Sequence, residues 1–441
     1  MSARRIFGHH LRVIGVFLFL FVVVGNVSYI HSFLRPAFLP LPFSFHAEWH
    51  PLSREDRFPS VEDRVKIYMH RWYAVGLCHN FTLPNIQYSR NEDGPYPTLQ
   101  VHNTSNDEEA LFLGLVQPDS KLLLNRPVVD DCADSRGGES PHVHQRGSMR
   151  SYCQNVQDLM DINDQFDTPL SRRTPLVAHF GDVAVNDDSV PMIGKWRNAM
   201  TRQELQDLTS QCPDNNELIS AIPTGSIIWK LETIRHWEPL EDSRSCDRAW
   251  EQKKPLAIWR GAFTGKGHAP SDLPPLQHCR ENQRCRFVLE HMNSKLIDAG
   301  IDDTVGLIPD TVNGVKLTKE RLSMGEFQSY KILISFEGND VASGLKWNLL
   351  SKSVVLMPKP TRTSWAMEEL LEPWVHYIPM DVDGANAEEM VQWVRDNDQK
   401  ARQISERATL FMYDLLYHPD AQRDERQVKE EIVRRYQEFW Y

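Results

Sequence analysis

Two short apolar runs enclose a polar turn and a helical pattern in the last third of the chain. Residues 332–336 form the first run, residues 337–340 the turn, and residues 354–357 the second run. Between the turn and the second run, apolar residues recur four positions apart: Val341, Leu345 and Leu349. Apolar runs of this length are typical of buried strands, and the four-residue spacing is typical of one helix face. The pattern therefore predicts a βαβ unit.

The turn of this unit has the character of an anion site. In open α/β sheets, ligands bind in the crevice at the carboxyl ends of the strands. A helix N-terminus in that crevice offers free backbone N–H groups and a partial positive charge. We expect the helix to begin near residues 340–343, which would place Lys346 in its first two turns as an additional cation. The pattern alone fits equally well an ordinary buried unit with a surface lysine.

Strand and helix patterns form two blocks on either side of residues 238–254, a charged segment without a strand pattern. Strands are expected ahead of this segment at residues 111–116, 175–180, 190–193 and 226–231. Strands with helical stretches between them predict a first Rossmann-like domain over residues 60–240 and a second over residues 255–418.

Helices are expected at both ends of this arrangement. Ser60 with Asp63 three residues later has the spacing of a helix N-cap. Residues 419–441 are expected to form a last helix that packs back on the first domain. The fold class predicted from these patterns is α/β.

The N-terminus has the pattern of a membrane anchor. Three arginines in residues 1–12 precede residues 13–34, which carry no charge and have about the length that spans a bilayer. Positive charge on the N-terminal side favours a cytoplasmic tail, a type II signal-anchor and, at residues 35–59, a luminal stem. A cleaved signal peptide is the alternative. The sequons at Asn80 and Asn103 are consistent with a chain in the secretory lumen.

Composition narrows the functional classes. The chain of 441 residues is 41% apolar and carries a net charge of −11, without a long basic run beyond the N-terminus. Nucleic acid is therefore excluded as an expected partner, because binding it requires clustered lysine and arginine. Seven cysteines form no CxxC pair, which argues against a structural zinc site. Their pairing cannot be read from spacing, although Cys279 and Cys285 are close enough for a local bridge.

Several separated motifs resemble glycosyltransferase family 90, in the family's order, from about residue 175 to about residue 415. They are Phe180-Gly181-Asp182, Ile234-Arg235-His236-Trp237, Trp259-Arg260-Gly261-Ala262, Glu337-Gly338-Asn339-Asp340-Val341-Ala342, Leu345-Lys346-Trp347, the segment Ser353–Pro360 and Pro373-Trp374-Val375-His376-Tyr377-Ile378-Pro379. That family contains capsule-associated xylosyltransferases, protein O-glucosyltransferases and bacterial relatives. The resemblance implies a GT-B pair of Rossmann-like domains, a UDP-sugar donor and inversion at the sugar carbon.

The resemblance also implies roles for particular residues. Asp182 matches the aspartate of the first-domain motif and is expected to be the general base, since an inverting transfer needs a group that takes the acceptor's proton. The donor is expected to bind to Arg260, Gly261, Glu337, Gly338, Asn339, Asp340, Ser343 and Lys346. Glu337 has a ribose contact or a turn-stabilising bond as its two expected roles, and Arg260 a phosphate contact or a buried ion pair.

The motifs specify the donor sugar and the acceptor less closely than the type of reaction. Ser343-Gly344-Leu345 and Phe263 depart from the protein O-glucosyltransferase branch, and the bacterial branch matches better, which puts glucose and EGF-like acceptors in doubt. Xylose or glucose, moved to a hydroxyl of a glycan or glycoprotein in the Golgi or ER, is the expected transfer. No metal or other cofactor is expected, because the GT-B fold that the resemblance implies generally needs none. Asp381-x-Asp383 has the spacing of a metal motif but is expected to cap the helix at residues 387–397. A catalytically silent relative that only binds sugar nucleotide or glycan is the alternative.

Overall fold

The computed structural model describes residues 53–73, 113–116, 122–124, 158, 176–179, 191–207, 225–267 and 272–439. The expected base Asp182, the sequons at Asn80 and Asn103, and the anchor at residues 13–34 lie outside these ranges. Among the described helices, none is long and apolar enough to cross a membrane.

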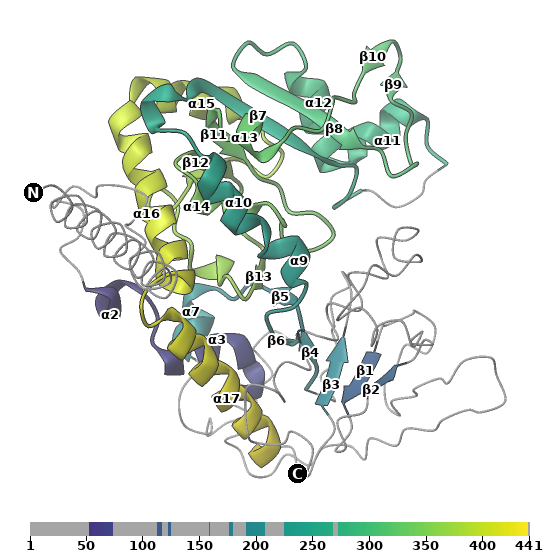
Figure 1. Ribbon diagram of the computed structural model, residues 1–441. Helices are drawn as coiled ribbons and strands as arrows, with labels where there is room; N and C mark the ends of the chain where they lie inside the picture. The colour runs from purple at the N-terminus through teal and green to yellow at the C-terminus, as the bar shows by residue number, and fades with distance from the viewer. Residues whose placement is uncertain are drawn as a thin grey trace, which may run out of the picture.

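The structure has two units, one mainly ahead of residues 238–254 and one mainly after them, here called the first and the second unit. The larger sheet is wholly parallel and forms the centre of the second unit (Figure 1). Its strands are β7 (Lys254–Ala262), β8 (Ile297–Asp303), β11 (Tyr330–Ile334), β12 (Val354–Met357) and β14 (Ile378–Pro379). They lie in the order β14-β12-β11-β7-β8. The predicted βαβ unit is confirmed, because β11 and β12 pair in parallel.

Helices cover both faces of this sheet: α11 (Pro275–Glu281), α12 (Gln283–His291), α14 (Leu345–Leu350), α15 (Ala387–Asp396) and α16 (Asp398–Leu416). Val354 and Leu356 of β12 belong to the core that includes residues of α12 and α15. Val355 and Met357 belong to the other core, which includes residues of α14 and the second half of α16. Successive strand residues point to opposite faces, so a strand buried on both sides must be apolar throughout.

The smaller sheet is mixed, which differs from the Rossmann-like domain expected. It consists of β1 (Leu113–Val116), β2 (Leu122–Leu124), β3 (Leu176–His179), β4 (Ile193–Gly194) and β6 (Ile227–Ile228), in the order β2-β1-β3-β4-β6. The last three strands pair in parallel, but β1 is antiparallel to both β2 and β3. The connection between β1 and β2 is too short for the crossover that parallel pairing requires. The described structure is thus a mixed α/β fold with parallel strands in both sheets.

A two-stranded sheet joins the two units. The strand β5 (Trp196–Asn198) of the first unit pairs antiparallel with β13 (Arg362–Ser364) of the second. Beside it the Arg197 guanidinium contacts the Glu369 carboxylate at 2.6 Å from Nη2 to Oε1, and neither side chain is exposed. Main-chain hydrogen bonds and a buried ion pair therefore set how the units meet.

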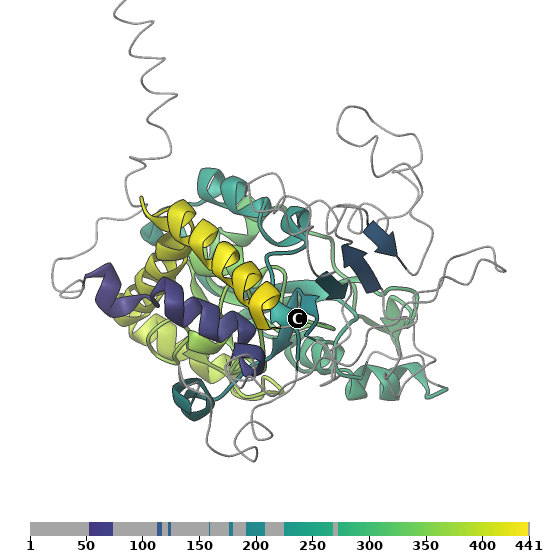
Figure 2. The same ribbon diagram turned by 90° about the horizontal axis from the view of Figure 1, so that it is seen from below.

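The last described helix lies against a helix from the beginning of the described chain. The helix α17 (Ala421–Phe439) packs along α3 (Val61–Met69), with α2 (Arg54–Arg57) nearby (Figure 2). The predicted N-cap is confirmed, since the Ser60 hydroxyl accepts a hydrogen bond from the Asp63 N–H. The Tyr436 hydroxyl donates to the Pro191 carbonyl at 3.0 Å and so ties α17 to the start of β4.

Short elements complete the described chain. The charged segment between the units contains no strand before β7, as predicted, but it does contain the helix α10. Cys279 and Cys285 form a disulfide that links α11 to α12, while Cys246 is free and exposed. The remaining short elements are α7 (Arg202–Asp207), α9 (Thr233–His236), α10 (Pro239–Cys246), η4 (Trp250–Gln252), β9 (Thr311–Val312), β10 (Val315–Lys316), α13 (Met324–Phe327) and η5 (Glu368–Leu370).

Candidate functional site

A cavity of about 790 Å³ opens at the carboxyl ends of β7 and β11. From β7 the chain proceeds to β8 on one side, whereas β11, β12 and β14 follow in turn on the other side. The point between β7 and β11 is therefore where the strand order reverses, and ligands of open α/β sheets bind at this point. Ile234, Arg235 and Pro239 line the cavity from the segment around α9, so both units contribute to it.

The cavity collects most of the residues that the motifs predicted for donor binding. Those that line it are Arg260, Gly261, Gly338, Asn339, Asp340 and Ser343. They come from the end of β7 and from the loop that follows the neighbouring strand β11, which is why motifs far apart in sequence meet here. The same lining contains Arg284 and Arg321, which the sequence did not single out, and the acidic residues Asp302 and Asp303.

Arg284 is the most informative of these additions. Its guanidinium donates to the carbonyls of Ala262 and Phe336 at 3.1 and 2.9 Å, and to the Thr264 hydroxyl at 2.7 Å. None of these acceptors is charged, and no ion pair to Arg284 exists among the residues that the structure describes. Burial lowers the pKa of Arg284 to about 10, which leaves it protonated at neutral pH. A buried cation that lacks a direct counter-ion favours an anion in the adjoining cavity.

Two glycines let the loops approach Arg284 closely. A side chain on Gly338 would come within 3.1 Å of the Arg284 Nη2 atom. Gly265 has a φ of +87°, and a side chain there would lie 3.2 Å from the carbonyls of Glu337 and Gly338. The loop after β7 is also bound to the loop after β11, because the Gly265 N–H donates to the Asn339 side-chain oxygen at 2.9 Å. These contacts place loop 337–340 directly over the start of α12.

Arg260 adopts the second of its two expected roles. Its Nη2 atom lies 3.1 Å from the Asp298 carboxylate, and Nη1 donates to the main-chain carbonyls of Trp259 and Asp298. Only 5% of its side chain is exposed. The guanidinium therefore braces β7 against β8, although the residue still lines the cavity.

The expected position of the helix N-terminus is wrong, and with it the position of Lys346. Helix α14 begins only at Leu345, after a non-helical loop that includes Val341 and Ser343. Position 346 consequently turns inward, and Lys346 is 1% exposed. It lines neither the large cavity nor the smaller one on the other side of the loop. Its ammonium lies 3.2 Å from the Glu368 carboxylate and 3.4 Å from Nδ1 of His236. It stabilises the junction of the units instead of offering a cation to the crevice.

Glu337 lines a second, smaller cavity of about 260 Å³ on the other side of the same loop. Its carboxylate accepts from the N–H groups of Thr361 and Arg362 at 2.8 and 3.0 Å, and from the Thr361 hydroxyl. Burial raises the pKa of Glu337 above its ordinary value despite these bonds. Of its two expected roles, the structure shows the turn-stabilising one.

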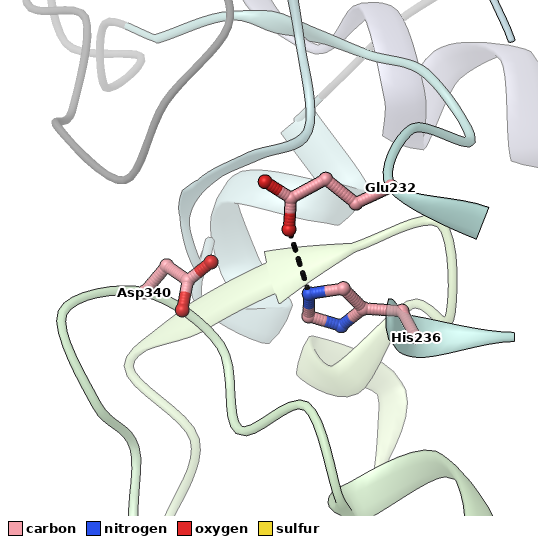
Figure 3. Close-up of side chains that lie close together, drawn as sticks. All are labelled: Glu232, His236 and Asp340. Atoms are coloured by element: carbon pink, nitrogen blue, oxygen red, sulfur yellow. Dashed lines mark ion pairs between the residues drawn. The ribbon is translucent and has the colours of Figure 1, made fainter. Parts of the chain in front are cut away.

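Three potential metal ligands meet at the junction of the units: Glu232, His236 and Asp340 (Figure 3). The Glu232 carboxylate lies 3.2 Å from Nε2 of His236, and Asp340 reaches toward them from the opposite loop. Burial and the neighbouring Lys346 lower the pKa of His236 to about 4, so the imidazole is neutral at pH 7. Burial alone would raise the pKa of Glu232, but His236 and Lys195 together hold it below its ordinary value.

A lysine occupies the centre of this cluster. The Lys195 ammonium lies 3.0 Å from the Glu232 carboxylate and 2.6 Å from the Asp340 carboxylate. A cation is therefore already present between the two acidic side chains. The Asp381-x-Asp383 spacing has a simple local explanation as well, because Asp383 accepts from the Ala385 N–H in the turn before α15.

The profile of glycosyl transferase family 90 matches residues 175–421 of this chain, which is more than half of it. The chain belongs to this family. The match includes both loops of the larger cavity and all strands of the parallel sheet. The residues that line the switch-point cavity all lie within the matched range.

Individual relatives match over shorter stretches. The chain is similar to O-glucosyltransferase LpsA of Dichelobacter nodosus, with 30% identity over 189 residues, which is 43% of this chain and 51% of that protein. It is also similar to human protein O-glucosyltransferase 1, with 27% identity over 180 residues, which is 39% of this chain and 40% of that protein. The uncharacterized protein 035R of Invertebrate iridescent virus 3 is 30% identical over 175 residues, 37% of this chain and 15% of that protein. The chain thus spans about half the length of these relatives or less.

Proposed function

We propose that this family 90 member transfers a sugar from a UDP-sugar to a hydroxyl of a glycan or glycoprotein, with inversion at the sugar carbon. The observation that supports it most directly is Arg284, a buried guanidinium without a counter-ion among the described residues, beside the switch-point cavity. A diphosphate would supply the missing negative charge. The cavity volume of about 790 Å³ lies in the range of small-molecule sites.

In the proposed complex, the donor diphosphate lies against Arg284 and the loop that contains Gly338 and Asn339. An arginine binds phosphate oxygens through two N–H groups at once, and its charge stabilises the leaving diphosphate as the glycosidic bond breaks. Asp182 takes the proton from the acceptor hydroxyl as that oxygen attacks the sugar carbon. The products are the glycosylated acceptor and UDP, and the proton is on Asp182.

The proposal extends to substrate, setting and cofactor. The names of two relatives specify O-glucosyl transfer, and the departures in the motif at residues 343–345 leave xylose beside glucose as the proposed donor sugar. The domains are proposed to form a GT-B pair. Residues 13–34 are proposed to anchor the chain as a type II protein of the Golgi or ER, with the catalytic part in the lumen. No metal is proposed as a requirement.

The decisive experiment measures donor binding and turnover on the full-length protein in detergent. Calorimetry with UDP is expected to show binding, and UDP-xylose, UDP-glucose and UDP-galactose are then compared for hydrolysis without acceptor. Release of UDP from one donor distinguishes an enzyme from a silent binding relative, and EDTA is expected to leave it unchanged. Absence of binding by UDP and by every donor would exclude the proposed function.

A separate experiment tests the anchor. Replacement of the segment through residue 34 by a cleavable signal peptide is expected to release a soluble, secreted protein that still binds UDP. The intact chain is expected to resist extraction with alkaline carbonate. Carbonate extraction of the intact chain would contradict an anchor at residues 13–34.

A further inference from the structure

Lys195 lies where the two units and the loop of the proposed donor site come together. It sits between β4 and β5, and its ammonium contacts Glu232 from the segment before α9 and Asp340 from the loop after β11. The three side chains are between 3% and 7% exposed. One cation thus links a first-unit carboxylate to the loop that lines the switch-point cavity.

Several charged or titratable side chains surround this cluster. Asp340 lies near Lys195, Glu232 and His236. Its negative charge also acts on Arg284, whose pKa it raises against the effect of burial. Glu232 contacts Lys195, His236 and, at 3.7 Å, Arg235. His236 contacts Lys346, which pairs with Glu368. Lys195 contacts both carboxylates, at 3.0 and 2.6 Å, and so bridges Glu232 and Asp340 directly.

We propose that Lys195 is a positioning residue that holds loop 337–344, through Asp340, in the conformation that binds the donor diphosphate. This inference rests on the proposed function and adds a residue to it. Asp340 and Arg284 lie on the same cavity, so displacement of the loop would change the surface that Arg284 presents to the ligand. The main-chain carbonyls of Gly338 and Asp340 are held from the other side, by Arg362.

A purely structural role for Lys195 is less consistent with the contacts around it. The units are already joined next to it by the β5–β13 pairing and by the buried pair between Arg197 and Glu369. Loss of Lys195 would leave these links in place. It would, however, leave the buried carboxylates of Glu232 and Asp340 without a bridging cation. Their oxygen atoms lie within 4.8 Å of each other, and like charges that close repel. The expected response is a displacement of Asp340 and the loop segment around it, although Arg362 and Gly265 still hold neighbouring atoms of residues 338–340.

A metal ion is the competing occupant of this cluster, since Glu232, His236 and Asp340 bring ligand atoms within 4.8 Å of one another. The ammonium of Lys195 already lies within hydrogen-bond distance of two of these ligands. A second ammonium, that of Lys346, lies 3.4 Å from the imidazole. Two lysines among three ligands oppose a divalent cation, so the lysine bridge is favoured.

The test replaces Lys195 by methionine in the full-length protein and measures UDP affinity against pH. At pH 7.5 we expect about 5- to 150-fold weaker UDP binding, the range typical of coupling between sites. Affinity should recover as the pH falls toward 5.5, because the two carboxylates can then share a proton that replaces the ammonium. Wild type should lack this recovery. Lys195→Arg should restore most of the affinity, and Lys400→Met, an exposed lysine on α16, serves as the charge-matched control.

A double variant keeps the test informative if Lys195→Met does not fold. In Lys195→Met/Glu232→Gln, the glutamine amide can donate a hydrogen bond to the Asp340 carboxylate, which removes the repulsion and restores the link. We expect this variant to fold and to bind UDP nearly as wild type does at every pH. Loss of UDP binding in the folded double variant, without pH dependence, would overturn the proposed bridge.

Other outcomes also decide between the alternatives. Folded Lys195→Met with unchanged UDP affinity and unchanged pH dependence would show that Lys195 does not position the loop. Tight binding of Zn²⁺ or Mn²⁺ by wild type, abolished by His236→Ala, would show a metal site in place of the lysine bridge. If wild type itself fails to bind UDP, the proposed function is wrong, which the wild-type titration in the same series reveals separately.

Discussion

Replacement of Arg284 by glutamine tests the proposed diphosphate site most directly. Glutamine retains an amide donor and much of the side-chain volume, but it removes the charge. In the structure the guanidinium donates to two carbonyls and one hydroxyl and forms no ion pair with the described residues. The charge is therefore not needed to neutralise a protein carboxylate in direct contact, and its removal should affect mainly an anionic ligand.

The expected magnitude follows from the strength of a charge-assisted hydrogen bond. A hydrogen bond to a charged group contributes about 1.5–3 kcal/mol. Removal of one such bond to phosphate should weaken UDP binding by about 10- to 150-fold, since each 1.4 kcal/mol is a factor of ten. Removal of the three bonds to neutral acceptors also lowers stability, so folding is checked first by thermal denaturation with and without ligand.

Calorimetry with UDP and with uridine separates direct phosphate binding from a structural effect. Wild type should bind UDP more tightly than uridine, and Arg284→Gln should remove most of that difference while it leaves uridine affinity unchanged. Arg280→Gln, an exposed arginine at the end of α11, is the matched control and should behave as wild type. An equal decrease in uridine and UDP affinity would show that Arg284 only supports the loops, and unchanged UDP affinity would remove it from the site.

Three further predictions concern the base, the buried histidines and the disulfide. Asp182→Asn should bind UDP as wild type does while turnover falls by about 10²–10⁴-fold, as typical for loss of a general base; normal turnover would place the base elsewhere. Burial lowers the pKa of His236 and His376 from 6.5 to about 4, so the unfolded chain binds more protons between these values. Unfolding free energy from urea titrations should therefore decrease as pH falls from about 6.5 to about 4, by roughly 1.4 kcal/mol per pH unit for each histidine, and His376→Gln should reduce the slope. Replacement of Cys279 and Cys285 by alanine should lower the free energy of unfolding by about 2 kcal/mol. It should also weaken UDP binding, because the disulfide adjoins Arg284. Unchanged UDP affinity would show that α12 holds its position without the disulfide.

The sequence was most informative where a local pattern is sufficient to specify local structure. The βαβ unit was predictable because a strand buried on both faces must be apolar throughout, as residues 354–357 are. The N-cap at Ser60 was predictable because the hydroxyl and the Asp63 N–H are three residues apart in any such helix. The family could be recognised because its motifs occur in order along the chain.

Local patterns were insufficient where a contact partner is distant in sequence. Val341 has the spacing of a helix residue with Leu345 and Leu349, yet it lies in the loop, because residues 337–344 are held by contacts to Arg362, Lys195 and Gly265 instead of helical hydrogen bonds. The antiparallel edge of the first sheet likewise depends on which strands meet. Neither effect is visible in the periodicity of one segment.

The chemical roles of the charged residues were decided by tertiary structure alone. Arg260, Arg284 and Lys346 are equally cationic in the sequence. Folding places Asp298 against the first and Glu368 against the third, whereas the second faces only neutral acceptors among the described residues. The sequence determined that cations and glycines gather in family motifs on a parallel sheet. Which cation stays available to a diphosphate depends on where the carboxylates of other segments come to lie, since a buried charge is stabilised by the nearest opposite charge whatever its position along the chain.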